Sequence, residues 1–289
     1  MSETVTHCPL CHSDRSRPFD RRDFRGQAVV NRLCRNCGLV YQSPRMTGAE
    51  SAEFYAAEYR KMYQGGEGPN VKDLAVQRAR ANSLYEFTRR HVGRVTRHLD
   101  IGCSSGLLLQ KFRETFGSQP AGIEPGEAYR EYARASGIPV HASLDELKGE
   151  APFDLVSMAH VLEHLPDPVG YLANLREKFL APEGWLLLEA PNLYCHDSFE
   201  VAHLFSFSAR TLRQTLEKAG FQVAALESHG RPRSTILPYY LTALARPAQP
   251  QREFVLRPER GAAIKRRLGL LRRRVLSRLF PKKAWIELT

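Results

Sequence analysis

The chain has 289 residues, 43% of them hydrophobic, and a formal net charge of +11. That length supports one sizeable α/β core with a small additional unit, and no apolar run approaches the roughly 18 residues of a membrane-spanning helix. The first residues lack the charged and then apolar pattern of a secretion signal, so we expect a protein of the reducing cytoplasm.

The basic charge is concentrated at the C-terminal end. Residues 257–289 hold eleven Lys and Arg against two acids, a balance of +9, which leaves only +2 for the remainder of the chain. A catalytic face that binds nucleic acid needs basic residues in the body of the protein. Nucleic acid is therefore not the expected partner.

Residues 1–46 contain two C-x-x-C pairs. Each pair can turn two thiolates toward one ion, and together they supply the four soft ligands of a closed tetrahedral Zn²⁺ site. A closed site leaves no coordination position for substrate, so this zinc would be structural. Four unrelated thiols would not explain the paired spacing, and no βαβ pattern supports a redox role. The expected zinc ligands are Cys8, Cys11, Cys34 and Cys37.

Residues 47–92 have a helical pattern that is broken at residues 64–69. Thr47 and Glu50 form a capping-box pattern at its start. Two interpretations of this segment stay open, packing on the main domain or a lid over a ligand pocket. Three tyrosines fall on one face of the first helix: Tyr55, Tyr59 and Tyr63.

Residues 93–245 alternate short apolar runs with helical patterns. This alternation predicts a doubly wound, Rossmann-like and mostly parallel sheet, which binds ligands beyond the C-terminal ends of its strands. Strands are expected within residues 94–102, 119–126, 138–143, 153–165 and 185–192 and at the end of 208–230, and helices within 104–117, 127–137 and 168–184 and at the start of 208–230.

The first of these strands runs into a turn of small residues, "LDIGCSSG". Such a turn lets a ligand lie against the backbone. The acid at the strand end, Asp100, repels phosphate but attracts a cationic amino group. Glu124 ends the second strand, 22 residues after Gly102, where a carboxylate can take both ribose hydroxyls. A nucleoside joined to an amino acid, with no phosphate required, describes S-adenosylmethionine (SAM).

With this turn, four further stretches carry a family resemblance: "GIEPG", "FDLVSMAHVLEHLPDP", "GWLLLEAPN" and "HLFSFSARTLRQTLEKAGF". The chain resembles class I SAM-dependent methyltransferases of the group with an N-terminal zinc-ribbon segment, whose members act in sugar, polysaccharide and natural-product pathways. The resemblance implies a seven-stranded sheet. Ser104 stands where the family has a glycine, a departure that is tolerable if its φ is negative.

The resemblance also assigns cofactor residues. Asp100, Gly102, Ser104 and Gly106 would lie along the methionine part, and Glu124 would hold the ribose. The remaining positions would form the adenosine wall (Pro125, Gly126), the adenine edge (Ala142, Ser143, Leu144) and the surroundings of the reactive methyl group (Met158, Ala159, His160).

Methyl transfer to an alcohol needs a base for the hydroxyl proton, and histidine is the usual one near neutral pH. Three candidates are His160, His164 and His203. Together with Glu163, the first two resemble the E-x-x-E-H motif that ubiquinone-type O-methyltransferases link to a divalent metal, so a metal stays an alternative to a structural turn. His203 could equally cap the following helix.

Residues 246–289 comprise a polar linker and a basic tail. Residues 262–280 predict a basic amphipathic helix, which favours an anionic membrane surface or a partner protein. The alternative is a helix docked on its own domain with a solvated basic face. Its apolar stripe consists of Ile264, Leu268, Leu271, Val275 and Leu279.

The predicted function is SAM-dependent O-methylation of a sugar, glycan or small-molecule hydroxyl. Sugar C-methyltransferases with a similar zinc segment carry Y-x-E-H where this chain has E-V-A-H at residues 200–203, which disfavours C-methylation. A non-catalytic zinc- and SAM-binding module is a second alternative, and a methyltransferase of RNA or protein is a third. We expect a cytoplasmic enzyme, either free or held peripherally at the inner face of the membrane.

Overall fold

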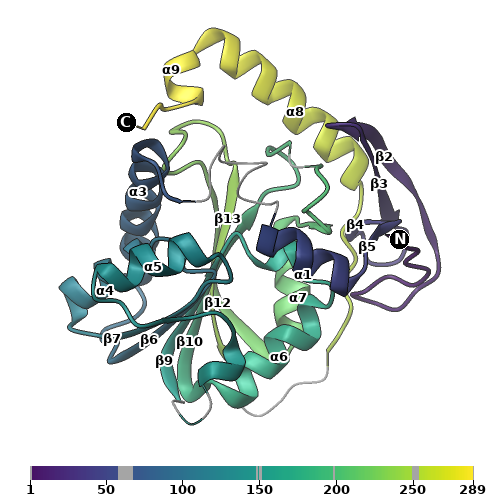
Figure 1. Cartoon of the computed structure of the whole chain (residues 1–289). Coiled ribbons are helices and arrows are strands. Elements are labelled where there is room, and N and C mark those ends of the chain that lie inside the picture. Colours follow the sequence, from purple (N-terminus) through teal and green to yellow (C-terminus); the bar gives the residue numbers. More distant parts are fainter. Residues whose placement is uncertain are drawn as a thin grey trace.

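The computed structural model describes residues 2–57, 68–147, 149, 152–197, 199–248 and 254–288. Its centre is a seven-stranded sheet in the order β12-β13-β10-β9-β6-β7-β8 (Figure 1). The strands are β6 (Arg97–Ile101), β7 (Gln119–Ile123), β8 (Val140–His141), β9 (Phe153–Ala159), β10 (Leu180–Pro191), β12 (Phe221–His229) and β13 (Tyr240–Pro247). Strands β6 to β10 pair in parallel, while β13 runs antiparallel to β10 and β12. The mostly parallel α/β fold predicted from the sequence is confirmed.

Helices cover both faces of this sheet: α3 (Val71–Thr88), α4 (Leu107–Phe116), α5 (Glu127–Ala135), α6 (Pro168–Lys178) and α7 (Ala209–Lys218). On one face, Leu84 and Phe87 of α3 share a buried apolar cluster with Phe112 of α4. On the other face, Leu172 of α6 and Leu212 of α7 lie in the largest core cluster (Figure 1). Because both faces of the sheet are covered, the sequences of most strands are nearly continuous apolar runs.

The strand β13 was not among those located in the sequence. It follows a loop with two prolines, Pro232 and Pro238, and no helix separates it from β12. The alternation of strand and helix that reveals the other strands therefore ends before it. Its residues from Tyr240 to Ala245 are all buried, as expected between β10 and β12.

The N-terminal segment forms a second sheet with the order β11-β4-β3-β2. Its strands are β2 (Ser16–Phe24), β3 (Gln27–Cys34), β4 (Val40–Gln42) and β11 (Phe205–Ser206). The strand β11 comes from the chain that follows β10, so part of the methyltransferase region completes the cysteine-bearing sheet. The domain boundaries stay predictions, but the two parts share main-chain hydrogen bonds.

Two short strands of the N-terminal segment, β1 (Ser2–Glu3) and β5 (Arg45–Met46), pair with each other, and the connecting segment begins with α1 (Gly48–Ala57). The capping box at its start is present: the N–H and Oγ1 of Thr47 donate to Glu50 Oε2 at 2.9 and 2.8 Å. Tyr59, Tyr63 and the side chain of Tyr55 lie outside what the structure describes.

The C-terminal segment forms α8 (Ala262–Leu279) and the short α9 (Pro281–Ala284), which cross the molecule beyond the C-terminal ends of the parallel strands (Figure 1). Within the described ranges, every helix is too short or too polar to cross a membrane.

The tight packing of the second cysteine pair against the C-terminal segment yields a stability prediction. Gly38 has a φ of +82°, and a Cβ there would collide with the backbone of Glu259. Gly38→Ala should therefore lower the free energy of unfolding by about 2–4 kcal/mol through strain and overlap. Gly26→Ala is the matched control, because Gly26 shares the φ of +82° but faces open space. In chemical denaturation the control should lose only about 1–2 kcal/mol, and equal losses would contradict the proposed collision.

Candidate functional site

A cavity of about 530 Å³ opens at the C-terminal ends of β6, β7 and β9. This is the edge at which ligands bind in parallel α/β sheets. Its lining comes from α1, α3, the glycine turn after β6, the end of β7 and the loop after β9. The lining residues are Gly48, Ser51, Asp73, Gln77, Arg80, Gly102, Ser104, Glu124, Pro125, Gly126, Ala159, His160, Val161, His164, Leu165 and Pro166.

The turn after β6 alternates left-handed positions. Gly102, Ser104 and Gly106 have φ values of +70°, +52° and +75°. The condition of a negative φ at Ser104 is therefore not met, because the turn needs the left-handed conformation at this position also. The Ser104 N–H donates to Glu124 Oε2 at 3.0 Å, and this bond helps to hold a conformation that is costly for a residue with a Cβ.

Glu124 is 3% exposed and ties two segments of the cavity wall together. Its Oε2 accepts the Ser104 N–H, and its Oε1 accepts the Gly126 N–H at 2.9 Å. Each carboxylate oxygen can accept more than one hydrogen bond. The same side chain can thus fix the glycine turn and still receive ligand hydroxyls.

The helix α3 contributes three polar side chains that the sequence analysis missed. Asp73, Gln77 and Arg80 share one face, at a spacing of i, i+4 and i+7. Gln77 Oε1 accepts the Ser105 hydroxyl at 2.5 Å, while Gln77 Nε2 donates to Asp73 Oδ2 at 2.7 Å. Polar residues lie on several faces of α3, so its sequence carries no signal that distinguishes these three, and only the packing of the helix brings them to the cavity.

Six of the predicted cofactor residues lie outside the lining. Asp100 is buried beneath the turn, where it accepts the Ser157 hydroxyl at 2.6 Å and where burial raises its pKa to about 7. Gly106 is the N-cap of α4 and Met158 lies in the core. Ala142, Ser143 and Leu144 follow β8, and Ser143 is exposed. For these six residues, the roles implied by the resemblance stay predictions.

His160 stands at the cavity wall between two buried carboxylates. Its Nδ1 lies 3.3 Å from Glu163 Oε1, and its Nε2 lies 3.3 Å from Glu189 Oε1. Arg80 also reaches Glu189, with 3.0 Å between Nε and Oε1. Burial alone would raise the pKa of Glu189, but the contacts with His160 and Arg80 lower it below its usual range.

A second group joins His164 and Glu163 to His203. One ligand atom from each lies within 4.8 Å of the others, and all three residues are buried. His164 Nδ1 donates to the carbonyl oxygen of Ala202 at 2.9 Å, while His203 Nε2 lies 2.9 Å from Glu200 Oε1. The sequence analysis grouped His160, Glu163 and His164 by their local spacing. The fold adds His203 from a distant segment.

The ionisation of this group follows from its burial. Burial lowers the pKa of His164 to about 4, so this imidazole is neutral at pH 7. Burial would raise the pKa of Glu163, but the contact with His160 and the neighbouring imidazoles of His164 and His203 hold it at about 2. The site therefore combines a neutral imidazole with an ionised carboxylate.

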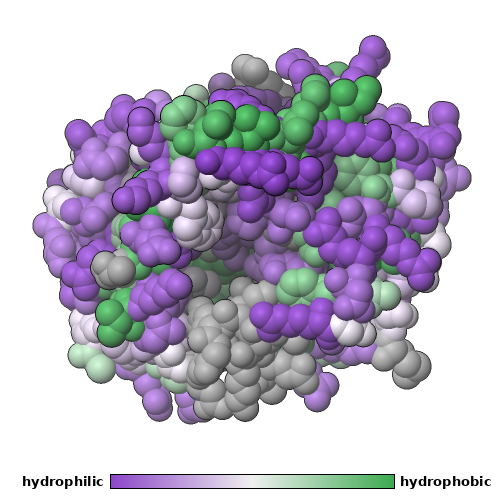
Figure 2. Space-filling model, turned by 90° about the horizontal axis from the view of Figure 1, so that it is seen from above, coloured by the Kyte–Doolittle hydropathy of each residue, from purple (hydrophilic) through white to green (hydrophobic). Residues whose placement is uncertain are grey.

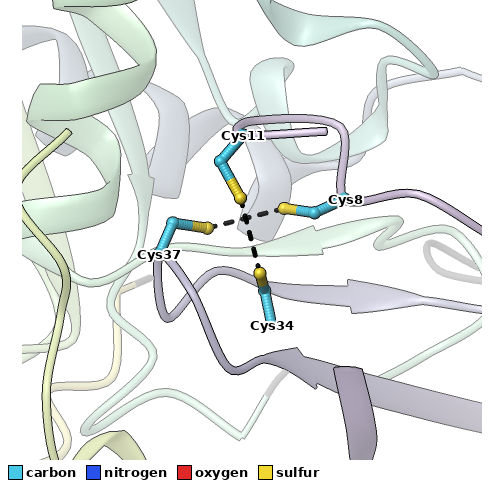
Figure 3. Close-up of side chains that lie close together, drawn as sticks. All are labelled: Cys8, Cys11, Cys34 and Cys37. Carbon is cyan, nitrogen blue, oxygen red and sulfur yellow. Dashed lines mark hydrogen bonds between the residues drawn. The ribbon is translucent and has the colours of Figure 1, made fainter. Parts of the chain in front are cut away.

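The four N-terminal cysteines converge as their spacing predicts (Figure 3). The Sγ atoms of Cys8 and Cys37 are 3.5 Å apart, as are those of Cys11 and Cys34. Hydrogen bonding to Cys34 and burial raise the pKa of the Cys8 thiol to about 12. The four sulfurs are thus close enough to share one ion and would not all ionise without a cation.

Comparison with known proteins identifies the family. A family model described as a methyltransferase domain matches residues 71–226, more than half of the chain. The chain belongs to this family. The fold is also that of the 1,6-didemethyltoxoflavin-N1-methyltransferase of Burkholderia thailandensis, solved with S-adenosylhomocysteine. The two share a TM-score of 0.59 and 21% identity over 79% of this chain and 99% of that one.

Two curated relatives differ in the acceptor that their names give. The ubiquinone biosynthesis O-methyltransferase of Nitrosospira multiformis is 31% identical over 38% of this chain and 52% of its own. The dTDP-4-amino-2,3,4,6-tetradeoxy-D-glucose N,N-dimethyltransferase of Saccharopolyspora spinosa is 26% identical over 50% of this chain and 58% of its own. The chain thus spans about half the length of the curated relatives it matches. The prediction of a SAM-dependent methyltransferase is confirmed for family and fold.

The position of Glu124 gives a binding prediction. Glu124→Ala should weaken SAM binding roughly 100-fold, because hydrogen bonds to a charged group contribute about 1.5–3 kcal/mol each. Glu127→Ala is the control, since Glu127 is an exposed acid three residues away. Titration calorimetry with SAM on both variants measures the effect. Unchanged affinity in a folded Glu124→Ala protein would show that the ribose binds elsewhere.

Proposed function

We propose that this chain is a SAM-dependent O-methyltransferase that acts on a hydroxyl of a sugar, a glycan or another small molecule. One observation carries the proposal. A single cavity has the glycine turn and Glu124 on one wall and two imidazoles, the half-buried His160 and the buried His164, on the other. The first wall suits a nucleoside joined to an amino acid, and the second suits a group that loses a proton.

The cofactor half of the cavity uses backbone more than side chains. Gly102 and Ser104 present a bare turn, and a Cβ at Gly102 would collide with Val161. Ala159 and His160, after β9, would lie beside the reactive methyl group. SAM supplies an electrophilic methyl carbon on a sulfonium. The chain's residues bind and orient it, so that an acceptor oxygen can approach opposite the sulfur.

His164 is the proposed proton acceptor. Its Nδ1 must carry the hydrogen, because it donates to a carbonyl oxygen. In a neutral imidazole the lone pair is then on Nε2. His164 lines the cavity and its ring packs edge-on against His203, with centroids 4.7 Å apart. As the acceptor oxygen bonds to the methyl carbon, the hydroxyl proton passes to Nε2, and the sulfur leaves with its electron pair as S-adenosylhomocysteine.

His203 and His160 have positioning roles in this proposal. His203 pairs with Glu200 and supports the His164 ring from behind. Both ring nitrogens of His160 face carboxylates, so this side chain is better placed to orient a substrate than to accept a proton.

A divalent metal at Glu163, His164 and His203 is the second candidate. Both carboxylate oxygens of Glu163 are buried without a hydrogen-bond partner in the described part of the chain. Two imidazoles and a carboxylate are ligands that several divalent ions accept. A metal there would polarise the acceptor hydroxyl, and His164 would be a ligand rather than a base. Metal analysis separates the two candidates. A second ion per chain, beyond the one at the cysteines, that is lost in Glu163→Gln would favour the metal. One ion per chain in both proteins would favour the base.

The base assignment makes a kinetic prediction. His164→Ala should lower kcat about 100-fold or more, the usual contribution of a general base, while SAM affinity stays near that of the wild type. His91→Ala is the control, because His91 is exposed and follows the C-terminal end of α3, whereas the cavity is lined by the first part of that helix. Full activity in the His164→Ala enzyme would refute the assignment.

The acceptor class is tested by incubating the protein with SAM and a panel of sugars, sugar nucleotides and phenols. Release of S-adenosylhomocysteine, with a product heavier by one CH₂ group, identifies a substrate. In the proton magnetic resonance spectrum of the product, we expect one hydroxyl signal to be replaced by that of an O-methyl group. Methylation confined to amines or carbon atoms would refute O-methylation, and no turnover with retained SAM binding would favour the non-catalytic alternative.

We propose further that Cys8, Cys11, Cys34 and Cys37 hold a structural Zn²⁺. The sulfur separations of 3.5 Å are near the roughly 3.8 Å that tetrahedral ligation with Zn–S bonds of about 2.3 Å requires. The sulfurs belong to the same apolar cluster as Leu212 and Leu216 of α7. Zinc would therefore stabilise the methyltransferase domain as well as its own sheet.

Removal of one ligand tests this zinc proposal. Elemental analysis should find one zinc per wild-type chain, and Cys34→Ser should lose it. Because loss of a structural metal is among the largest single effects on stability, the free energy of unfolding should fall by more than about 4 kcal/mol. Cys195→Ala, a buried cysteine outside the cluster, should keep its zinc. A fully folded wild-type protein without zinc would contradict the proposal.

A further inference from the structure

The helix α8 rests on the domain through a polar face. Arg266 is 5% exposed, and its guanidinium donates to the carbonyl oxygens of Leu193 and His196 and pairs with Asp197 at 2.9 Å. Gly269 lies directly against the backbone of Tyr194. One turn further, Arg273 Nη1 donates to Cys195 O at 3.1 Å. Arginine and glycine contacts thus hold α8 to the segment after β10, and Leu276 on the same face of the helix packs against the apolar cluster around Cys195 and Tyr239.

The opposite face of α8 is apolar and exposed. Ile264, Leu268, Leu271, Val275 and Leu279 are 45–65% exposed, and we call them the outer stripe. They recur at helical spacing about half a turn from the docking residues. Figure 2 shows this stripe as a continuous band of hydrophobic atoms along α8, beside a hollow in the same face of the molecule.

This arrangement reverses the usual amphipathic helix, which turns its apolar side to the core. Of the ten exposed large hydrophobic residues in the described chain, seven lie between Ile264 and Trp285. Scattered exposed leucines are normal, but a contiguous patch bordered by charge marks an interaction site. The outer stripe therefore needs a partner outside the chain.

Charge identifies the partner. At about 100° per residue, three arginines lie on one side of the outer stripe and two cations on the other, and all five are exposed. The helix contains no acidic residue. A second copy of α8 would bring arginine against arginine, whereas an anionic lipid surface receives the apolar stripe and both cationic borders together. The borders are Arg267, Arg274 and Arg278, and Lys265 and Arg272.

We propose that α8 is a membrane-surface helix that binds anionic lipid with its axis along the bilayer plane. Phe280 and Trp285, 48% and 46% exposed, extend the apolar surface beyond the helix with rings of the kind that favour the lipid–water interface. The hollow in Figure 2 then faces the bilayer with the stripe. If the proposed methyltransferase function holds, the acceptor is a hydroxyl compound carried by the membrane.

Flotation with the full chain tests the proposal. We expect the protein to rise with vesicles of phosphatidylcholine and phosphatidylglycerol, to stay below with phosphatidylcholine alone, and to dissociate as salt screens the charges. The Trp285 emission should shift to shorter wavelength on binding. These readouts need neither SAM nor an acceptor, so they stand apart from the test of methylation.

Matched variants separate a specific surface from general positive charge. Replacing Arg267, Arg274 and Arg278 by Gln should weaken binding about 100-fold, because each cation near an anionic surface contributes about fivefold. Leu268→Ser with Leu271→Ser should also weaken it at unchanged charge. The control replaces Arg94, Lys178 and Arg246 by Gln, which removes three exposed cations from the opposite end of the sheet.

Wild-type flotation that does not depend on anionic lipid would overturn the proposal. So would a control triple variant that loses binding as strongly as the α8 triple variant. If sedimentation instead finds a dimer that the Leu268→Ser and Leu271→Ser changes dissociate, without vesicle binding by the wild type, the outer stripe is an interface between copies.

Discussion

The hydrogen bond from the Ser104 N–H to Glu124 connects the two strands on which the site is built. β6 and β7 are parallel neighbours, so the turn after one and the carboxylate after the other meet at the same edge. Glu124 fixes the turn and also orders Gly126 at the start of α5. A single buried carboxylate thus positions the bare backbone of one segment, the entry to a helix and a wall of the cavity. Other parts of the site are arranged around this connection.

On the histidine side of the cavity, buried carboxylates are compensated by neighbouring imidazole and guanidinium groups. Glu163 and Glu189 are fully buried, and an isolated carboxylate there would be driven toward its neutral form. His160 lies between them, and Arg80 joins Glu189 from α3. The helix α3 therefore does more than cover the sheet, because its cation balances a carboxylate at the end of β10. Such coupled groups are poor stabilisers and good candidates for chemistry.

Local pattern predicted the parts of the site whose geometry is local. The D-x-G-x-S-x-G turn and the register of Glu124 follow from strand ends in one parallel sheet, and His160 and His164 follow from their spacing. Contacts between distant segments were harder to foresee. Gln77 reaches Ser105 only because α3 packs on α4, and His203 reaches Glu163 only after a long excursion. A negative φ is not what makes serine tolerable at position 104, because the left-handed conformation there is held by a hydrogen bond.

The tail illustrates a related limit. Periodicity alone showed that Ile264 to Leu279 form one stripe, but a stripe does not say which way it faces. Packing decides that question, and here the backbone carbonyls after β10 accept hydrogen bonds from Arg266 and Arg273. Burying Arg266 and seating Gly269 on Tyr194 orients the helix, and the apolar residues are then exposed as a consequence. The same contacts that fasten α8 to the domain thus fix the direction in which its outer stripe points, beyond the C-terminal edge of the sheet where the cavity opens.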